Sequence, residues 1–292
     1  MDMTEYFEGL LGRIEPSDRH VAKAKAAHEL LRKRLKDDDT VGEAHEETYL
    51  SGSYARYTAI KNIKDVDIIC VLDIDREETE PVVLLRWLEA ALLEYYDDVR
   101  LQGRSIGVTT DEGFCLDVVP GSPQAGTDGP LWIPDREAGH WVTTHPKGQI
   151  EFATTRNAAT DGFYVQTVKI MKHWRDRLPE AVHPKSYVLE TLVAKTIGAG
   201  PPTSHAAAVV QVLEGIWNSY WAWVGTATVP TISDPGFASL NVAKRWEANE
   251  FDAFMARVQP AAATARQAWE ETDQSMSASA WRRLFGLEFA PA

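Results

Sequence analysis

The spacing of apolar residues divides the first half of the chain into alternating helical and extended segments. From Ser17 to about Lys36 apolar residues recur every three or four positions, which predicts an amphipathic helix with Ser17 capping its start. From 65 to 74 the chain alternates polar and apolar residues and then becomes continuously apolar. Such a segment is typical of a strand at the centre of a sheet.

Downstream of this strand the pattern changes to a helix and then to further strands. Pro81 can open a helix in which leucines form one apolar stripe. The segments 99–109 and 114–119 flank the turn signal Asp111-Glu112-Gly113, which predicts a long antiparallel hairpin. The stretch 120–155 is rich in Pro, Gly and Thr, and we interpret it as a loop that crosses between two lobes.

After Asn157 the apolar positions follow a helical period. We expect helices at 163–178, 186–197, 204–223 and 242–272, with a short closing helix at 281–285. These elements predict an α+β fold in two lobes. Residues 1–155 form a mixed sheet with flanking helices and an N-terminal helix, and residues 156–292 form a helical C-terminal lobe.

Charge and composition exclude several classes of protein. The net charge of −13 argues against tight binding to long nucleic acid, which depends on Lys and Arg, although a small anionic substrate is still compatible. The chain has no apolar run of about 18 residues, so we expect a cytoplasmic protein with no membrane association. Cys70 and Cys115 lie in apolar segments and are interpreted as buried thiols in a reducing compartment.

Two carboxylates at the start of the acidic strand suggest a metal site. Asp65 and Asp67 are two residues apart, so on a strand both side chains leave the same face. Like charges that close are unfavourable unless a cation lies between them, and Mg²⁺ prefers carboxylate and phosphate oxygens. For an isolated Asp-x-Asp pattern, a loop cap beside an exposed strand residue is the simpler explanation.

The context of the pair favours the metal site. Gly52-Ser53 forms a small-residue turn before the strand, and its N–H groups and hydroxyl suit the distal phosphates of a triphosphate. Asp117 lies in an otherwise apolar strand, where an unpaired carboxylate is costly. If the hairpin packs beside the acidic strand, three carboxylates can hold two metal ions about 4 Å apart.

This arrangement resembles the catalytic core of DNA polymerase beta-type nucleotidyltransferases. Lys172, the pair Ser186-Tyr187 and the segments around Asp234 and Asn241 further resemble the helical half of the bacterial CD-NTases, which are relatives of cyclic GMP-AMP synthase and oligoadenylate synthase. The resemblance extends from about residue 50 to 242. It implies a polymerase beta-like core and a helical lobe that completes the NTP pocket.

The resemblance also implies a role for each matching residue. Gly52 and Ser53 would hold the triphosphate, while Asp65 and Asp67 would bind two Mg²⁺ or Mn²⁺ ions. Asp117 would bind the metal that activates the acceptor hydroxyl. Lys172 and Ser186 would touch phosphates and Tyr187 would lie near the donor base, whereas a snorkelling lysine and a helix N-cap are the simpler explanations for Lys172 and Ser186. Asp234 and Asn241 are not assigned any chemistry.

The expected function follows from this resemblance. We expect a monomeric enzyme that joins ATP, GTP, UTP or CTP into a cyclic or short linear oligonucleotide messenger, releases pyrophosphate and acts in antiphage signalling through a product-sensing effector protein. A nucleotidyltransferase that modifies a tRNA end, a small molecule or a protein is the alternative. A catalytically inactive scaffold of the same fold is disfavoured, because all three acids are present.

Overall fold

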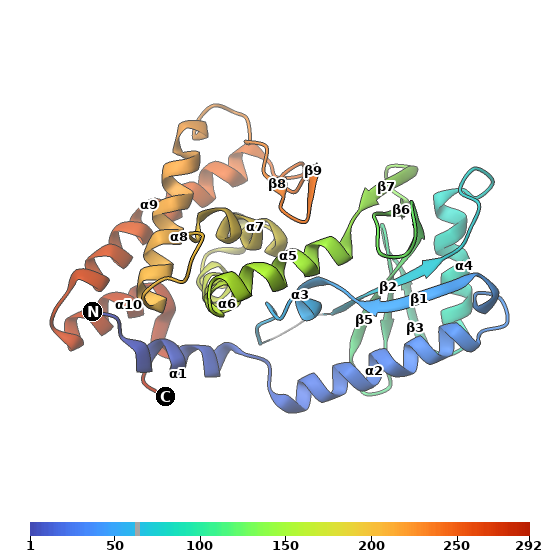
Figure 1. Ribbon diagram of the computed structural model, residues 1–292, viewed down its shortest axis with the longest axis horizontal. Helices are drawn as coiled ribbons and strands as arrows, with labels where there is room; N and C mark the ends of the chain where they lie inside the picture. The colour runs from blue at the N-terminus through green and yellow to red at the C-terminus, as the bar shows by residue number, and fades with distance from the viewer. Residues whose placement is uncertain (62–64) are drawn as a thin grey trace. The chain divides into compact units, whose positions relative to one another are not determined.

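A computed structural model describes residues 1–61 and 65–292 as two compact units (Figure 1). One unit is continuous, Pro16–Glu151, and the other combines Met1–Glu15 with Phe152–Ala292. The boundary at 151/152 falls inside helix α5 (Pro146–Ala159). The first fifteen residues therefore pack with the helical unit, whereas the sequence placed them with the sheet. The functional division into 1–155 and 156–292 remains a prediction.

The continuous unit is a mixed sheet covered by two helices. The sheet order is β1-β2-β5-β4-β3, with β6 pairing to β5 and to β7. Strands β2 and β5 run parallel, and their neighbours in this order are antiparallel. The strands span β1 (His45–Leu50), β2 (Val66–Leu72), β3 (Asp98–Leu101), β4 (Ile106–Thr109), β5 (Cys115–Pro123), β6 (Leu131–Asp135) and β7 (His140–Thr144).

Two helices bury one face of this sheet. Helix α2 (Asp18–Asp37) starts where Ser17 accepts a hydrogen bond from the His20 N–H, and α4 (Pro81–Leu93) starts at a proline, as the sequence predicted. Their leucines pack with Val66 and Ile68 of β2 and with Leu116 and Val118 of β5. Since side chains alternate along a strand, Asp67 and Asp117 leave the opposite face.

The structure corrects the predicted hairpin and loop. Residues 99–109 are not one strand: β3 and β4 meet at a turn of residues 102–105. The expected loop 120–155 holds the end of β5, then β6, β7 and the start of α5. The prolines at 123 and 134 lie within strands β5 and β6, and strand pairing between residues distant in sequence overrides the local turn signals.

The second unit is mainly helical. It contains α1 (Thr4–Ile14), α6 (Phe163–Asp176), α7 (Ser186–Thr196), α8 (His205–Tyr220), α9 (Ala248–Glu270) and α10 (Gln274–Phe285), with a two-stranded β8–β9 ribbon (Ser233–Asp234, Phe237–Asn241). Phe7 of α1 is fully buried against Trp281, Phe285 and Phe289. Aromatic packing therefore joins the first helix to the end of the chain. Within the described residues, the helices are all too short or too polar to cross a membrane.

Candidate active site

Two of the predicted carboxylates are paired on neighbouring strands, and the third immediately precedes one of these strands. Asp67 of β2 is the register partner of Asp117 in β5, and Asp65 precedes the first residue of β2. The Asp65 carboxylate lies close enough to that of Asp117 for its charge to raise the pKa of Asp117. The parallel pairing of β2 with β5 therefore brings together acids that are fifty residues apart. Asp73 and Asp75 follow the other end of β2, away from this cluster.

Asp117 lies in an environment that disfavours a lone negative charge. Its side chain is half-buried, and burial together with the nearby Asp65 charge raises the pKa of its carboxyl group. The Gln102 amide opposes this rise by donating from Nε2 to Asp117 Oδ1 at 2.8 Å. A cation that binds both acids would relieve the repulsion between them.

The Gly52-Ser53 turn is built directly against Asp67. The N–H of Ser51 donates to the backbone oxygen of Asp67 at 2.8 Å, which holds the turn to the start of β2. Gly52 has a φ of +62°, and a Cβ at this position would lie 1.7 Å from Oδ2 of Asp67. Only glycine combines this backbone conformation with the close approach of the carboxylate. The turn continues as the short helix α3 (Gly52–Ala55).

The donor chemistry of this edge fits a divalent cation that takes oxygen ligands. Asp67 and Asp117 share one face of the sheet, and the charge of Asp65, just before β2, acts on Asp117. As their side chains stand, no group of three His, Cys, Asp or Glu within residues 1–61 and 65–292 is arranged to hold a metal ion. The fit therefore rests on the shared face of Asp67 and Asp117 and on the nearby charge of Asp65.

In the helical unit, the predicted nucleotide-binding residues already have protein partners. Lys172 of α6 is 3% exposed and its Nζ donates to Glu190 of α7 at 2.6 Å. The hydroxyl of Ser186 accepts from Arg175 at 2.8 Å instead of capping α7, whose cap residue is Lys185. The hydroxyl of Tyr187 donates to Asp234 at 2.8 Å. Their contacts with a nucleotide remain predictions.

Sequence reasoning missed the hydrogen-bond partners of the predicted site residues. Gln102 lies in a turn that the sequence placed inside a strand, so nothing local indicated its contact with Asp117. Glu190 lies eighteen residues after Lys172 and gave no pairing signal. The segment around Asp234 was noted for its resemblance to the CD-NTases, but Asp234 itself was not assigned any chemistry. Its side chain is fully buried and accepts from both Tyr187 and the Gly236 N–H.

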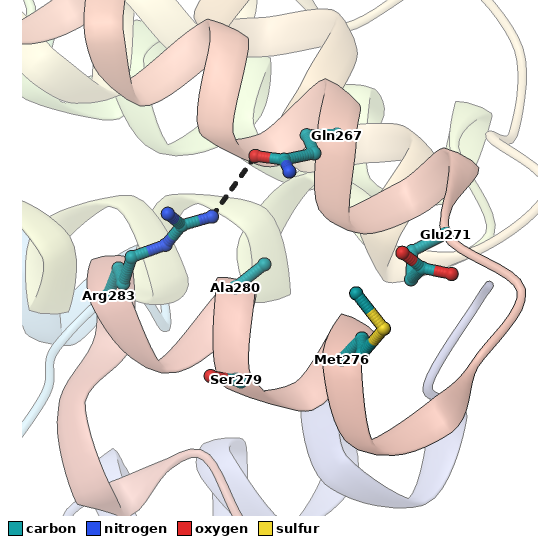
Figure 2. Close-up of a pocket in the computed structure, with 6 residues that line it drawn as sticks. All are labelled: Gln267, Glu271, Met276, Ser279, Ala280 and Arg283. Carbon is teal, nitrogen blue, oxygen red and sulfur yellow. Dashed lines mark hydrogen bonds between the residues drawn. The ribbon is translucent and has the colours of Figure 1, made fainter.

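A small cavity of the helical unit contains none of these residues. It lies between α9 and α10 and has a volume of about 230 Å³. Figure 2 shows the side chain of Arg283 donating to Gln267 on one side of it. Small-molecule sites usually measure about 300–1,000 Å³. We therefore do not assign it a role in catalysis.

The family is decided by comparison with known proteins. Residues 1–157 match the model of the Second Messenger Oligonucleotide or Dinucleotide Synthetase domain. The chain is also 33% identical to a cyclic AMP-AMP-AMP synthase from an Acinetobacter species, over 99% of this chain and 86% of that protein. This chain belongs to the Second Messenger Oligonucleotide or Dinucleotide Synthetase family. The family resemblance inferred from Asp65, Asp67 and Asp117 is thereby confirmed, as is the assignment of the chain as a nucleotidyltransferase.

A further relative and two solved structures agree with this family assignment and with the fold. A cyclic AMP-AMP-GMP synthase from Enterobacter hormaechei is 27% identical over 99% of this chain and 92% of the relative. The structure of Bradyrhizobium diazoefficiens CdnG with GTP superimposes with a TM-score of 0.81, at 16% identity and covering 97% of this chain and 96% of that one. Escherichia coli CdnC with ATP gives 0.78 at 17% identity, covering 99% of both chains. These structures confirm the predicted fold class.

Proposed function

We propose that this synthetase joins nucleoside triphosphates into a cyclic trinucleotide made mainly of adenylate. The proposal is carried by the likeness to a cyclic AMP-AMP-AMP synthase, which extends over 99% of the chain. A second relative is a cyclic AMP-AMP-GMP synthase, so the relatives differ in one base and the adenylate composition of the product is itself proposed. In each transfer, the acceptor hydroxyl oxygen forms a bond to the α-phosphorus. The bond from that phosphorus to the bridging oxygen breaks, and pyrophosphate leaves.

Each of the three acids is proposed to have its own part in binding metal for this reaction. Asp65 and Asp67 are proposed to hold two Mg²⁺ or Mn²⁺ ions with the triphosphate, and Asp117 to share the ion nearest the acceptor. Bound metal supplies charge neutralisation and lowers the pKa of the acceptor hydroxyl. The half-buried position of Asp117 beside Asp65 supports this role, since a carboxylate there needs a positive neighbour.

The remaining site residues are proposed to bind the donor nucleotide. Gly52 and Ser53 would hold the distal phosphates through N–H groups and a hydroxyl, which the close approach of this turn to Asp67 supports. Ser186 is proposed to touch a phosphate together with its partner Arg175. Tyr187 is proposed to lie near the base. Lys172 would have to exchange its contact with Glu190 for a phosphate, so its assignment carries the least support.

The cellular setting is also a proposal. We propose a monomeric cytoplasmic enzyme in antiphage signalling, whose product is sensed by an effector protein. The solved structure of an Escherichia coli CdnC:HORMA complex, with a TM-score of 0.78, gives this fold a precedent for a protein partner. Transfer to a tRNA end, a small molecule or a protein remains the alternative. The net charge of −13 disfavours tRNA.

An acceptor-free reaction tests the proposed function. Purified protein is incubated with labelled ATP, alone and mixed with GTP, in the presence of Mg²⁺ or Mn²⁺. We expect phosphatase-resistant products that mass spectrometry identifies as cyclic trinucleotides. The Asp65→Ala/Asp67→Ala double variant should stay folded and make none, because these carboxylates bind metal and do not support the core. Product formation only after adding tRNA or another acceptor would favour the alternative.

A further inference from the structure

The turn between β3 and β4 places one amide against Asp117. Gln102 donates from Nε2 to Asp117 Oδ1 at 2.8 Å, and at its other end the amide oxygen accepts from the Ser105 hydroxyl at 3.1 Å. The hydroxyl donates to the carbonyl oxygen of the amide, while the NH₂ group can only donate. These two contacts therefore fix which end of the Gln102 amide faces the carboxylate.

The turn that carries Gln102 is held in place along its whole length. The Gln102 N–H donates to the backbone oxygen of Ser105 at 2.9 Å. Arg104 contacts one oxygen of Asp135 through Nε at 2.9 Å and Nη2 at 2.6 Å, and the Asp135 side chain is only 2% exposed. The Arg136 N–H donates to the backbone oxygen of Gly103 at 2.8 Å. A turn fixed in this way can hold a side chain in one orientation at little entropic cost.

The strand beneath the amide leaves room for it. Gly107 of β4 is the register partner of Asp117. A Cβ at Gly107 would lie 2.5 Å from Gln102 Nε2 and 3.4 Å from Asp117 Oδ1. Any larger residue at 107 would therefore displace the amide. The turn contacts and this glycine are independent features, and both favour the same placement of Gln102.

We propose that Gln102 is the positioning residue of Asp117 in nucleotide transfer. This inference rests on the proposed role of Asp117. A carboxylate beside Asp65 needs a donor to hold it before metal binds, and a neutral amide provides one without a positive charge that would compete with the metal. Gln102 therefore fixes the direction of the Asp117 oxygens, and Ser105 and Gly107 fix Gln102.

Single-turnover kinetics and metal titration test this role. Gln102→Leu keeps a similar volume and removes both hydrogen bonds. We expect the single-turnover transfer rate to fall about ten- to hundredfold, with affinity for a non-hydrolysable ATP analogue within about twofold. Electron paramagnetic resonance of Mn²⁺ with that analogue should show weaker binding of one ion. Gly107→Ala should likewise lower the transfer rate and weaken Mn²⁺ binding.

Three further variants make the result decisive. Ser105→Ala frees the amide with less risk to folding and should lower the rate by a smaller factor. Gln124→Leu is the matched control, since the Gln124 amide donates to Thr143 elsewhere in the same unit, and it should change neither rate nor Mn²⁺ binding. Asp117→Asn should lose both the transfer rate and the Mn²⁺ binding.

The outcomes separate this inference from the proposed function. Normal rate and Mn²⁺ binding in Gln102→Leu, beside a defective Asp117→Asn, overturn the positioning role and leave the function intact. Loss of donor affinity at an unchanged transfer rate also overturns it. If Asp117→Asn itself transfers nucleotides normally, the proposed role of Asp117 fails.

Discussion

At the scale of single residues, Gly52 is the position where backbone conformation and chemistry are most closely linked. Its positive φ would cost about 1 kcal/mol or more in any other common residue. A Cβ would also displace the Asp67 carboxylate, from which it would lie 1.7 Å. A substitution there should therefore harm catalysis beyond its effect on stability.

Gly52→Ala can be compared with a matched glycine. Gly113, in the turn before β5, also has a positive φ, of +73°, but a Cβ there would have no neighbour within 4 Å. We expect each alanine variant to lose about 1–2 kcal/mol of unfolding free energy because of its backbone conformation, and Gly52→Ala to lose more because its Cβ must displace the Asp67 carboxylate. Only Gly52→Ala should lose most of its transfer rate. Equal rates in the two variants would show that the approach of Gly52 to Asp67 has no role in catalysis.

At the scale of elements, the Lys172–Glu190 pair joins α6 to α7 through buried charges. Both side chains are at most 3% exposed. Removing one charge leaves the other buried without this opposite charge, so Lys172→Met should cost about 3–5 kcal/mol of unfolding free energy. The Lys172→Met/Glu190→Met double variant should recover most of this loss, and a double-mutant cycle by urea unfolding measures the recovery.

The same variants test the predicted nucleotide contact of Lys172. If Lys172 only joins the helices, the stable double variant should bind the ATP analogue with wild-type affinity. Weak analogue binding in a double variant of restored stability would instead support the phosphate contact.

The elements also show what the sequence could predict and why. Helices α2, α4, α6 and α8 were predicted because their apolar period and start signals are local. The acids Asp65, Asp67 and Asp117 were singled out because carboxylates close together or in an apolar strand are unfavourable without a cation, and their metal-binding role stays a prediction. Strands β6 and β7 were missed, since their stability comes from pairing across the sheet. Gln102 was missed because its contact depends on the length of a turn and on the register of β4 with β5.

At the scale of the whole molecule, buried histidines should make stability depend on pH. His28 of α2 is 5% exposed, and its Nε2 has no hydrogen-bond partner within the part of the chain that the structure describes. Burial, with a smaller effect of the Arg32 charge, lowers its pKa to about 4 from 6.5. Burial also lowers the pKa values of His45 and His205.

The direction of the pH effect follows from proton binding. Between pH 6.5 and 4 the unfolded chain takes up a proton that buried His28 does not, so the free energy of unfolding should fall with falling pH. One pKa unit corresponds to about 1.4 kcal/mol, so a shift from 6.5 to about 4 at His28 accounts for at most about 3.5 kcal/mol. His28→Leu should reduce the slope of urea-unfolding free energy against pH over this range. An unchanged slope would exclude His28 as a source.

The packing of α1 has a consequence for synthesis of the protein on the ribosome. Residues 16–151 form one continuous unit and can fold as soon as they have emerged. The helical unit cannot fold completely at that stage. Phe7 packs against Trp281, Phe285 and Phe289, which are translated more than 270 residues later. Until then α1 exposes an apolar face to the cell. Nascent chains should therefore hold a folded α/β unit while the helical unit is still incomplete.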